Sequence, residues 1–314
     1  MLEYDKCLIR SLTSVIKNNN CLNLYNLNSS LHTMKKFILS VLLICGTVLA
    51  FSQSKMACCA KPSATQRFAM LASSKKFVMS HALPKKFHFQ SAIAKTITYK
   101  TPDGKESTAY EWKAAKPSNN YLLVIHEYWG LNDYVKQQSE KLYTDLGNVN
   151  VIALDLYDGK IATTREDAGK FMQAVKEDRA QAIIKGAIVY AGPKARIATI
   201  GWCFGGGWSL QAALMAGKHL VGCVMYYGMP EQDVNKLKTL NADVLGNFAN
   251  KDQWINPKVV AKFAADMKAA GKKLELHQFD ADHAFANPSS PAANSQAAKD
   301  AYGFTVAFLK ARLK

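Results

Sequence analysis

One cysteine stands in a setting that favours nucleophilic chemistry. The segment Gly201-Trp202-Cys203-Phe204-Gly205 has the spacing of the G-x-S-x-G nucleophile elbow, with Cys in place of Ser. Such a turn joins a strand to a helix in a strained conformation, so side chains at Gly201 or Gly205 would collide with the neighbouring backbone. The following helix N-terminus stabilises a thiolate and a reaction oxyanion. The pattern predicts that Cys203 is a nucleophile raised above a sheet, within reach of solvent. The alternative is a tight turn whose cysteine only packs.

A nucleophile needs a base and a group that orients the base. Asp252 follows the apolar strand pattern around Val244, and His283 follows the next strand pattern. The chain order of nucleophile, acid and histidine is that of the α/β-hydrolases. Taken singly, these are an ordinary turn aspartate and an ordinary loop histidine. Together they predict that His283 takes the proton of the nucleophile and that Asp252 orients His283. Asp280 and Asp282 compete as orienting groups, although they lie too close to His283 in sequence to come from a separate strand end.

The loop His126-Glu127-Tyr128-Trp129-Gly130 follows another apolar strand pattern. It is not the H-E-x-x-H zinc motif, because Gly130 stands where the second histidine would be. In a nucleophile-elbow fold, the oxyanion hole uses one N–H from this loop and one from the residue after the nucleophile. That rule nominates the backbone N–H groups of Tyr128 and Phe204. Glu127 is then a carboxylate beside a thiol, able to hold or accept its proton, or else a solvated loop glutamate.

The elements that must position these residues follow from hydrophobic patterning. Two alternating segments flank a turn at 101–105 and predict a leading β-hairpin. Apolar strand patterns then alternate with helical patterns, which predicts an α/β fold with a mostly parallel sheet and helices on both faces. Chemistry in such sheets gathers at the carboxyl ends of the strands. We expect strands at 95–99, 108–112, 121–125, 149–154, 196–200, 220–225, 242–245 and 273–279, and helices at 133–146, 164–189, from 205, 257–270 and 295–313.

Over most of residues 95–314 the sequence resembles the dienelactone hydrolase family of the α/β-hydrolases. The likeness rests on 201–206, the His126-Glu127 loop, Asp155-Leu156-Tyr157, Asp252 and His283-Ala284-Phe285. The resemblance implies the α/β-hydrolase fold and a triad of Cys203, His283 and Asp252. It also implies that Glu127 interacts with the cysteine in the resting enzyme.

Two positions depart from the pattern of the family members that open dienelactone. Those enzymes use arginines for the substrate carboxylate, where this chain has Asn287 and the stretch Asp158-Gly159-Lys160. The departures favour another small ester or lactone as the substrate. No metal or organic cofactor is expected, since the sequence has no C-x-x-C pair or local His/Cys cluster.

Alternative functions remain open. One is a catalytically idle, hydrolase-like binding or thiol redox-sensing protein, because oxidation would block an exported cysteine nucleophile. Another is a class I glutamine amidotransferase, which also has a cysteine elbow but needs a His-x-Glu that does not follow Cys203 here. Four aromatic residues near the motifs are candidates for either pocket lining or core: Trp129, Trp202, Trp254 and Phe285.

The composition is that of a packed globular protein. The chain has 314 residues, 49% of them hydrophobic and 20% charged, which excludes disordered, collagen-like and multi-span membrane classes. The formal net charge is +16, from 40 Lys and Arg against 24 Asp and Glu. The lysines are scattered, without an arginine cluster or aromatic residues to stack on bases, so we expect a solvated basic surface and no nucleic-acid partner. The oligomeric state is not predicted.

The N-terminal region has the features of an export signal. The apolar run 37–51 follows Met34-Lys35-Lys36 and is too short to span a membrane, so residues 34–52 are interpreted as a signal peptide. A buried core helix is the alternative. Residues 1–33 are expected to be a disordered upstream extension, 53–93 an N-terminal tail containing Cys58 and Cys59, and 94–314 the hydrolase domain. The protein is exported to the periplasm or outside the cell if Met34 is the working start, and cytoplasmic otherwise.

Overall fold

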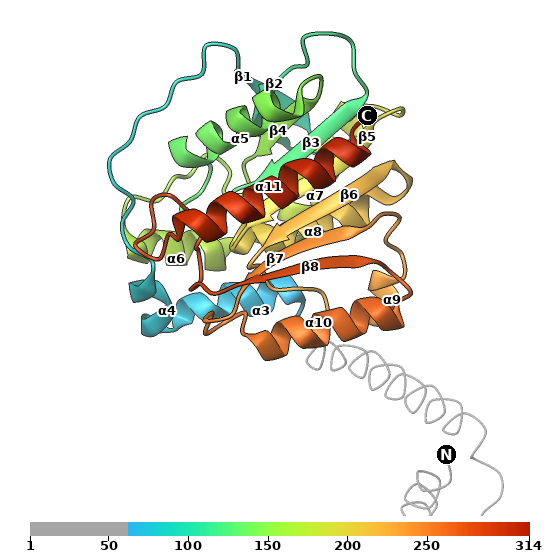
Figure 1. The fold of residues 1–314 in the computed structure, drawn as a ribbon. Helices are drawn as coiled ribbons and strands as arrows, with labels where there is room; N and C mark the ends of the chain where they lie inside the picture. The colour runs from blue at the N-terminus through green and yellow to red at the C-terminus, as the bar shows by residue number, and fades with distance from the viewer. Residues whose placement is uncertain (1–61) are drawn as a thin grey trace, which may run out of the picture. The chain divides into compact units, whose positions relative to one another are not determined.

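The computed structural model describes residues 62–314, which are built around one sheet (Figure 1). The sheet has eight strands in the order β1-β2-β4-β3-β5-β6-β7-β8. These strands are β1 (Lys95–Lys100), β2 (Glu106–Trp112), β3 (Asn120–Ile125), β4 (Asn150–Leu154), β5 (Arg196–Trp202), β6 (Leu220–Tyr226), β7 (Val244–Ala249) and β8 (Leu274–Phe279).

The leading hairpin and the parallel sheet are both confirmed. β1 and β2 are antiparallel, with Lys100 opposite Glu106, and the Thr101 N–H donates to the Lys105 carbonyl at 2.8 Å to close the turn. β2 also pairs antiparallel with β4. All later pairings, from β3–β4 to β7–β8, are parallel. The carboxyl ends of six strands therefore meet at one edge of the sheet, where the sequence places its candidate residues.

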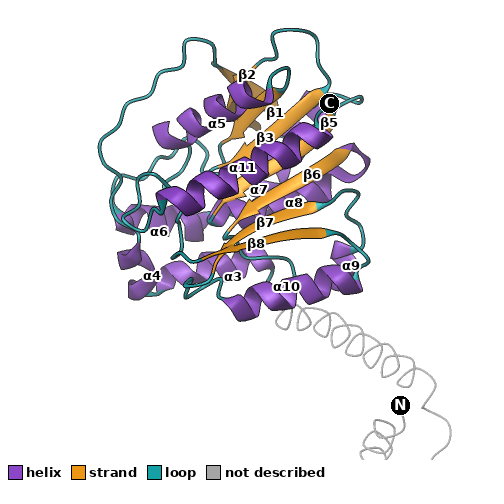
Figure 2. Cartoon of the chain, viewed as in Figure 1, coloured by secondary structure: helices purple, strands orange, loops and turns teal. Residues whose placement is uncertain are grey.

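Helices cover both faces of the sheet (Figure 2). α5 (Asp133–Leu146) and α11 (Ser295–Arg312) lie side by side on one face. α7 (Glu177–Ala191) and α8 (Phe204–Ala216) pack together on the other, while α10 (Pro257–Ala269) packs against the edge strand β8 and the short α9 (Val234–Leu237). The buried central strands β3 to β7 form the core between these layers. This architecture confirms the predicted α/β fold.

The single helix expected over 164–189 is two helices. α6 (Arg165–Ala174) ends before Val175, whose ψ of 113° is extended, and α7 begins after Lys176, which is also extended. Glu177 and Asp178 then occupy the first turn of α7, where the helix dipole favours negative charge. The break contains no Gly or Pro, so hydrophobic periodicity runs through it and did not reveal it.

The described part of the expected N-terminal tail is folded onto the domain. It forms α3 (Ala64–Met70), the 3-10 helix η2 (Leu71–Ser73) and α4 (Lys75–Ser80), with α3 packed against α6 and α8. Phe68 and Phe77 from these helices are buried in the core. Segments of six and seven residues show too few turns for a periodic pattern, which is why the sequence suggested only a tail. The predicted extension at 1–33 and signal peptide at 34–52 lie outside the described residues.

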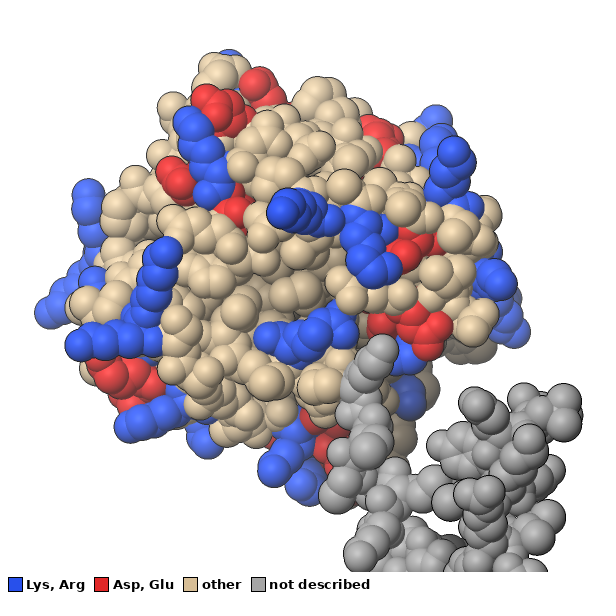
Figure 3. Space-filling view, turned by 90° about the horizontal axis from the view of Figure 1, so that it is seen from below, with Lys and Arg blue, Asp and Glu red and all other residues tan. Residues whose placement is uncertain are grey.

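Basic side chains are spread over the surface of the domain. In the view of Figure 3, Lys and Arg side chains are separated by uncharged surface, and several lie beside acidic ones. Arg179, for example, pairs with Asp103 at 3.2 Å and Asp158 at 2.6 Å. Between residues 62 and 314, the structure contains no helix with the length and apolarity to cross a membrane.

Candidate active site

Cys203 sits at a strained turn between β5 and α8. Its φ is 55° and its ψ is −117°, a backbone conformation that costs free energy for a residue with a side chain. A Cβ on Gly201 would lie 2.0 Å from the Gly205 carbonyl oxygen, and a Cβ on Gly205 would lie 2.3 Å from that of His126. The turn therefore needs glycine at both positions, as the G-x-C-x-G spacing predicted.

A chain of hydrogen bonds joins the cysteine to two residues from later strand ends. His283 follows β8, and its Nε2 lies 3.3 Å from the Cys203 Sγ. Asp252 follows β7, and its Oδ2 lies 2.6 Å from the His283 Nδ1. The other Asp252 oxygen accepts hydrogen bonds from the Trp254 and Ile255 N–H groups, at 2.8 and 2.9 Å. These contacts hold the Asp252 carboxylate toward the imidazole.

The competing orienting residues do not reach the imidazole through a hydrogen bond. Asp280 is exposed and pairs with Lys251 at 2.9 Å, while the exposed Asp282 borders the pocket beside His283. Among the three aspartates considered from the sequence, Asp252 is therefore the one whose carboxylate contacts His283.

The expectation that the sulfur would reach solvent is wrong. Cys203 is only 1% exposed, and His283 is 6% exposed. The N-terminal helices cover the site. Phe68 of α3 stacks beside the His283 ring, and the ring of His81, directly after α4, has its centroid 6.1 Å from that of His283. The elbow does lift Cys203 above the sheet, but segments that the sequence had suggested to be a tail close over it.

Burial and charge set the protonation of the three residues. Burial raises the pKa of the Cys203 thiol, although His283 acts in the opposite direction. Burial alone would lower the pKa of His283, but the Asp252 carboxylate and the cysteine raise it well above its usual range. Burial would also raise the pKa of Asp252, yet the charge and hydrogen bond of His283 lower it. The resting site thus favours a protonated thiol and an ionised aspartate beside an imidazole that binds protons tightly.

Glu127 lies beside this pair in the loop after β3. Burial raises its pKa to about 7, while the charge of His283 and a hydrogen bond from Asn287 act to lower it. The neighbouring His126 is structural, since its Nδ1 lies 2.9 Å from the Glu127 carbonyl and its Nε2 accepts from the Leu156 N–H at 3.1 Å. Glu127 is therefore a carboxyl group that changes charge near neutral pH, held in a fixed loop.

The two residues nominated for the oxyanion hole lie on adjacent segments. Phe204 begins α8, directly after Cys203 in the elbow. Tyr128 follows β3, which pairs directly with β5 in the sheet. The Tyr128 carbonyl accepts from the Tyr157 hydroxyl at 3.3 Å, and the Tyr128 hydroxyl donates to the Arg165 carbonyl at 2.9 Å. These bonds fix the backbone of the loop beside the elbow.

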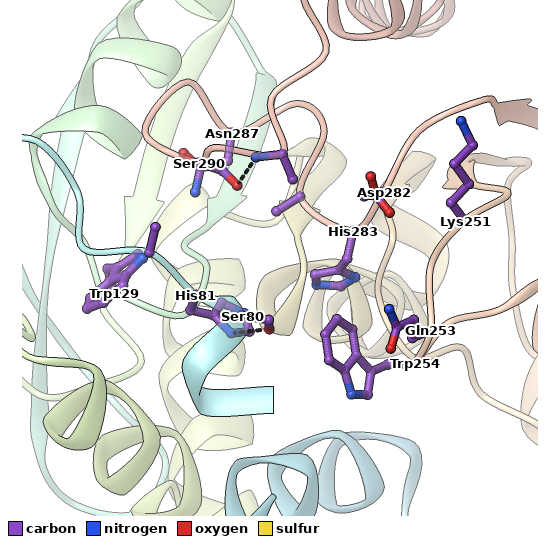
Figure 4. Close-up of a pocket in the computed structure, with 13 residues that line it drawn as sticks. Ser80, His81, Trp129, Lys251, Gln253, Trp254, Asp282, His283, Asn287 and Ser290 are labelled. Atoms are coloured by element: carbon purple, nitrogen blue, oxygen red, sulfur yellow. Dashed lines mark hydrogen bonds between the residues drawn. The ribbon is translucent and has the colours of Figure 1, made fainter. Parts of the chain in front are cut away.

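A pocket of about 200 Å³ adjoins His283 (Figure 4). Trp129 and Trp254, two of the four aromatic candidates, line it. Trp202 instead packs against Tyr226, and Phe285 is fully buried against Tyr227. Asn287 also lines the pocket, together with the charged Lys251 and Asp282, so the pocket combines two indole walls with several polar groups.

Sequence reasoning missed His81, which lines the same pocket. The ring stacks on Tyr128 with 4.1 Å between ring centroids, and its Nδ1 lies 2.8 Å from the Phe77 carbonyl oxygen. The serines that cap α3 and α4, Ser63 and Ser74, were the available signal that helices form here. Nothing in the sequence indicates that His81 faces a cysteine more than a hundred residues away.

Comparisons with known proteins agree with this architecture. The model of the dienelactone hydrolase family matches residues 108–313. Protein usf of Aquifex pyrophilus is 29% identical over 202 residues, which are 60% of this chain and 87% of that protein. A Saccharolobus solfataricus protein assigned as a carboxymethylenebutenolidase is 27% identical over 260 residues, which are 69% of this chain and 98% of that protein.

Solved structures show the same fold at low sequence identity. A dienelactone hydrolase-like promiscuous phosphotriesterase from metagenomic libraries superposes with a TM-score of 0.62 at 16% identity, covering 71% of this chain and all of that one. The family match begins within β2 and includes the elbow and the two strand ends that carry Asp252 and His283. The chain therefore belongs to the dienelactone hydrolase family, within the α/β-hydrolase superfamily.

Proposed function

We propose that this member of the dienelactone hydrolase family is a carboxylic ester hydrolase that opens a small ester or lactone through attack by the thiol of Cys203. The observation that carries the proposal is the hydrogen-bonded chain from the Cys203 Sγ through His283 to Asp252, at 3.3 and 2.6 Å. A nucleophile, a base and an orienting carboxylate in this order are the components of acyl transfer.

In the first half of the reaction, Cys203 attacks the substrate carbonyl carbon and a sulfur–carbon bond forms. The thiol proton passes to Glu127 or His283, since the pKa of Glu127, raised by burial to about 7, makes it a base near neutral pH. The carbonyl oxygen becomes an oxyanion held by the N–H groups of Tyr128 and Phe204, each worth about 3–4 kcal/mol in measured hydrolases. The carbon–oxygen bond then breaks, and imidazolium protonates the departing alkoxide.

In the second half, His283 takes a proton from water, which attacks the thioester. Asp252 keeps the imidazole in the tautomer that can accept this proton at Nε2 and stabilises the imidazolium that forms. The acid product leaves, and Cys203 recovers its proton. Atoms balance as the addition of one water to one ester bond.

The pocket favours a small substrate with both apolar and polar parts. Its volume of about 200 Å³ and its walls of Trp129 and Trp254 suit a short acyl chain or a small lactone ring. Asn287 and the stretch Asp158-Gly159-Lys160 stand where dienelactone-opening relatives use arginines, and Asp158 pairs with Arg179 at 2.6 Å. We therefore propose an uncharged ester or lactone rather than dienelactone itself.

A panel of nitrophenyl esters and small lactones tests this function. We expect turnover by the wild type and loss of turnover in Cys203→Ala. Cys223→Ala is the matched control, because Cys223 is also fully buried but contacts Ser209 in the core, with 3.6 Å between Sγ and Oγ. Turnover that persists in Cys203→Ala, or no turnover of any compound by the wild type, would contradict the proposal. The second result would favour a binding or redox-sensing protein.

A further inference from the structure

The structure gathers three side chains that can bind a soft metal ion. Ligand atoms of His81, Cys203 and His283 all lie within 4.8 Å of one another, and all three side chains are buried. The residues are far apart in sequence, so no local spacing motif indicates the cluster. Within residues 62–314 it is the single group of three or more such side chains that close together. His81 has no part in the proposed hydrolysis.

His81 presents a nitrogen that lacks a partner. Its Nδ1 lies 2.8 Å from the Phe77 carbonyl oxygen, which can only accept, so Nδ1 carries the proton and Nε2 has the free lone pair. The side chain is 9% exposed, and Nε2 is buried without a hydrogen-bond partner among the described residues. Stacking on Tyr128 fixes the ring. A buried acceptor left without a donor costs free energy, which a ligand at Nε2 would recover.

His283 is held in the same way. Its Nδ1 contacts Asp252, which leaves Nε2 directed at the Cys203 Sγ. Metal-bound histidines commonly donate their other ring N–H to a carboxylate or a backbone carbonyl, which fixes the tautomer and the ring. Asp252 performs this task for His283, and the Phe77 carbonyl performs it for His81. In both imidazoles the Nδ1 atom is held by an oxygen acceptor, so Nε2 is the nitrogen left to bind a metal.

We propose that His81, Cys203 and His283 form a zinc-binding site, with the two imidazole Nε2 atoms and the cysteine sulfur as ligands. Thiolate and imidazole are the donors that zinc prefers, and three protein ligands leave a fourth position for a small molecule. Tetrahedral zinc places its nitrogen and sulfur ligands roughly 3.3–3.6 Å from one another. The Cys203–His283 distance of 3.3 Å already fits, so the ring of His81, at the end of α4, has to approach the pair.

Zinc binding is balanced by the release of protons from Cys203 and His283, because zinc requires a thiolate and a neutral imidazole. A thiol beside an imidazolium releases two protons, whereas a thiol beside a neutral imidazole, or a thiolate beside an imidazolium, releases one. His81 adds no further proton, because its Nδ1–H donates to the Phe77 carbonyl and its Nε2 carries a lone pair. Bound zinc would occupy both the sulfur and the Nε2 that acyl transfer needs. Zinc would therefore inhibit the proposed hydrolysis, and His81 would be responsible for the sensitivity.

Cobalt(II) tests the site directly, because a cysteine thiolate bound to cobalt gives a charge-transfer absorption in the near ultraviolet. The full chain is used with the five cysteines outside the described residues changed to serine: Cys7, Cys21, Cys45, Cys58 and Cys59. We expect the band to saturate at one cobalt per chain, to disappear on addition of zinc, and to be absent in Cys203→Ser. The readout does not depend on turnover, so its failure is distinct from failure of the hydrolase proposal.

Two variants test the contribution of His81 to metal binding. His81→Asn keeps a side-chain N–H that can reach the Phe77 carbonyl but removes the lone pair at the Nε2 position, and His81→Phe keeps a ring that can stack on Tyr128. Both should need at least about tenfold more cobalt for half saturation, since even outer-shell changes weaken metal sites by that factor. The control is His88→Ala, because the His88 side chain is 84% exposed. A missing band in the parent chain, or unchanged cobalt affinity in His81→Asn and His81→Phe, would overturn the proposal.

Discussion

In the proposed reaction, the thiol of Cys203 must lose its proton before it attacks, and burial raises the pKa of this thiol. The structure supplies two groups for that proton, and they differ in charge at neutral pH. His283 binds protons tightly because Asp252 faces it, whereas the pKa of Glu127 is raised to about 7. Glu127 is thus the group best matched to accept the thiol proton near neutrality.

The raised pKa of Glu127 leads to a prediction for the pH dependence of hydrolysis. The base form of a carboxyl group is the ionised one, which predominates above its pKa, so kcat/KM should rise with pH through about 7. Glu127→Gln should lower kcat/KM by about 10²-fold and remove this rise. The measurement is a pH–rate profile on a nitrophenyl ester, with Glu166→Gln as the control because Glu166 is exposed. A profile in Glu127→Gln that still rises through neutrality would assign the ionisation to another group.

The elbow and the N-terminal helices act as elements rather than as single side chains. Gly205 lets α8 start close to the loop after β3, since a Cβ there would lie 2.3 Å from the His126 carbonyl oxygen. We expect Gly205→Ala to destabilise the fold by about 3 kcal/mol or more, because backbone atoms would have to move. Gly303 in α11 has open space around it, so Gly303→Ala should stabilise the fold by about 0.5–1 kcal/mol.

Chemical denaturation of the two glycine variants measures both effects. The pair forms a matched control, since each change adds one methyl group to a helical glycine. Equal stability of Gly205→Ala and the wild type would mean that the close approach of α8 to the loop is not required.

The α3–α4 segment is expected to control access to the sulfur. Phe77 of α4 is fully buried and packs on His81 and Trp254, with ring centroids 4.5 and 5.2 Å apart. Removing a buried phenyl ring costs about 3–5 kcal/mol of packing, so Phe77→Ala should loosen this cover. We expect alkylation of Cys203 by iodoacetamide to become at least tenfold faster, as followed by mass spectrometry. Val189→Ala, at a site 75% exposed, should leave the rate unchanged, and an unchanged rate in folded Phe77→Ala would show that α4 does not limit access.

Long, regular elements were predictable from the sequence, and short ones were not. The helix at Asp133–Leu146 and most of the buried strands lie where the apolar patterns placed them, because these patterns extend over several residues. The strand expected at 242–245 is an exception, since β7 covers Val244–Ala249 and continues through Gly246 and Asn247, which interrupt the apolar run. The break at Val175 and Lys176 was hidden, since neither residue is a helix breaker. The helices before Ser80 are too short for a pattern, and the position of His81 depends on tertiary packing that no local signal records.

For the candidate site, the identity of the residues was predictable from the sequence, but their burial was not. Cys203, Asp252 and His283 were identified because the elbow spacing and the order of strand ends are properties of the sequence. The burial of the sulfur was not predictable, because it depends on the N-terminal helices folding back over the carboxyl edge of the sheet. The whole molecule thus combines a family scaffold with an N-terminal cover that precedes the segment matched by the family model.

For the whole chain, we also propose export through a signal peptide that begins at Met34. The expected result of N-terminal sequencing of the natural protein is a start near Gln53, because the basic start, the apolar run and the small residues that follow it end there. A mature protein that begins at Met1, recovered from the cytoplasm, would contradict the export proposal. The charge changes little in either case, since the chain from Gln53 onward remains strongly basic.

The most direct test of the central proposal is to trap the acyl group. Rapid mixing with a nitrophenyl ester should give a burst of about one nitrophenol per chain, and mass spectrometry of the quenched enzyme should find the acyl group as a thioester on Cys203. The burst should be lost in His283→Ala, which lacks the imidazole that lies 3.3 Å from the sulfur. Ester hydrolysis by the wild type with no acyl group on Cys203, or an undiminished burst in His283→Ala, would contradict the account.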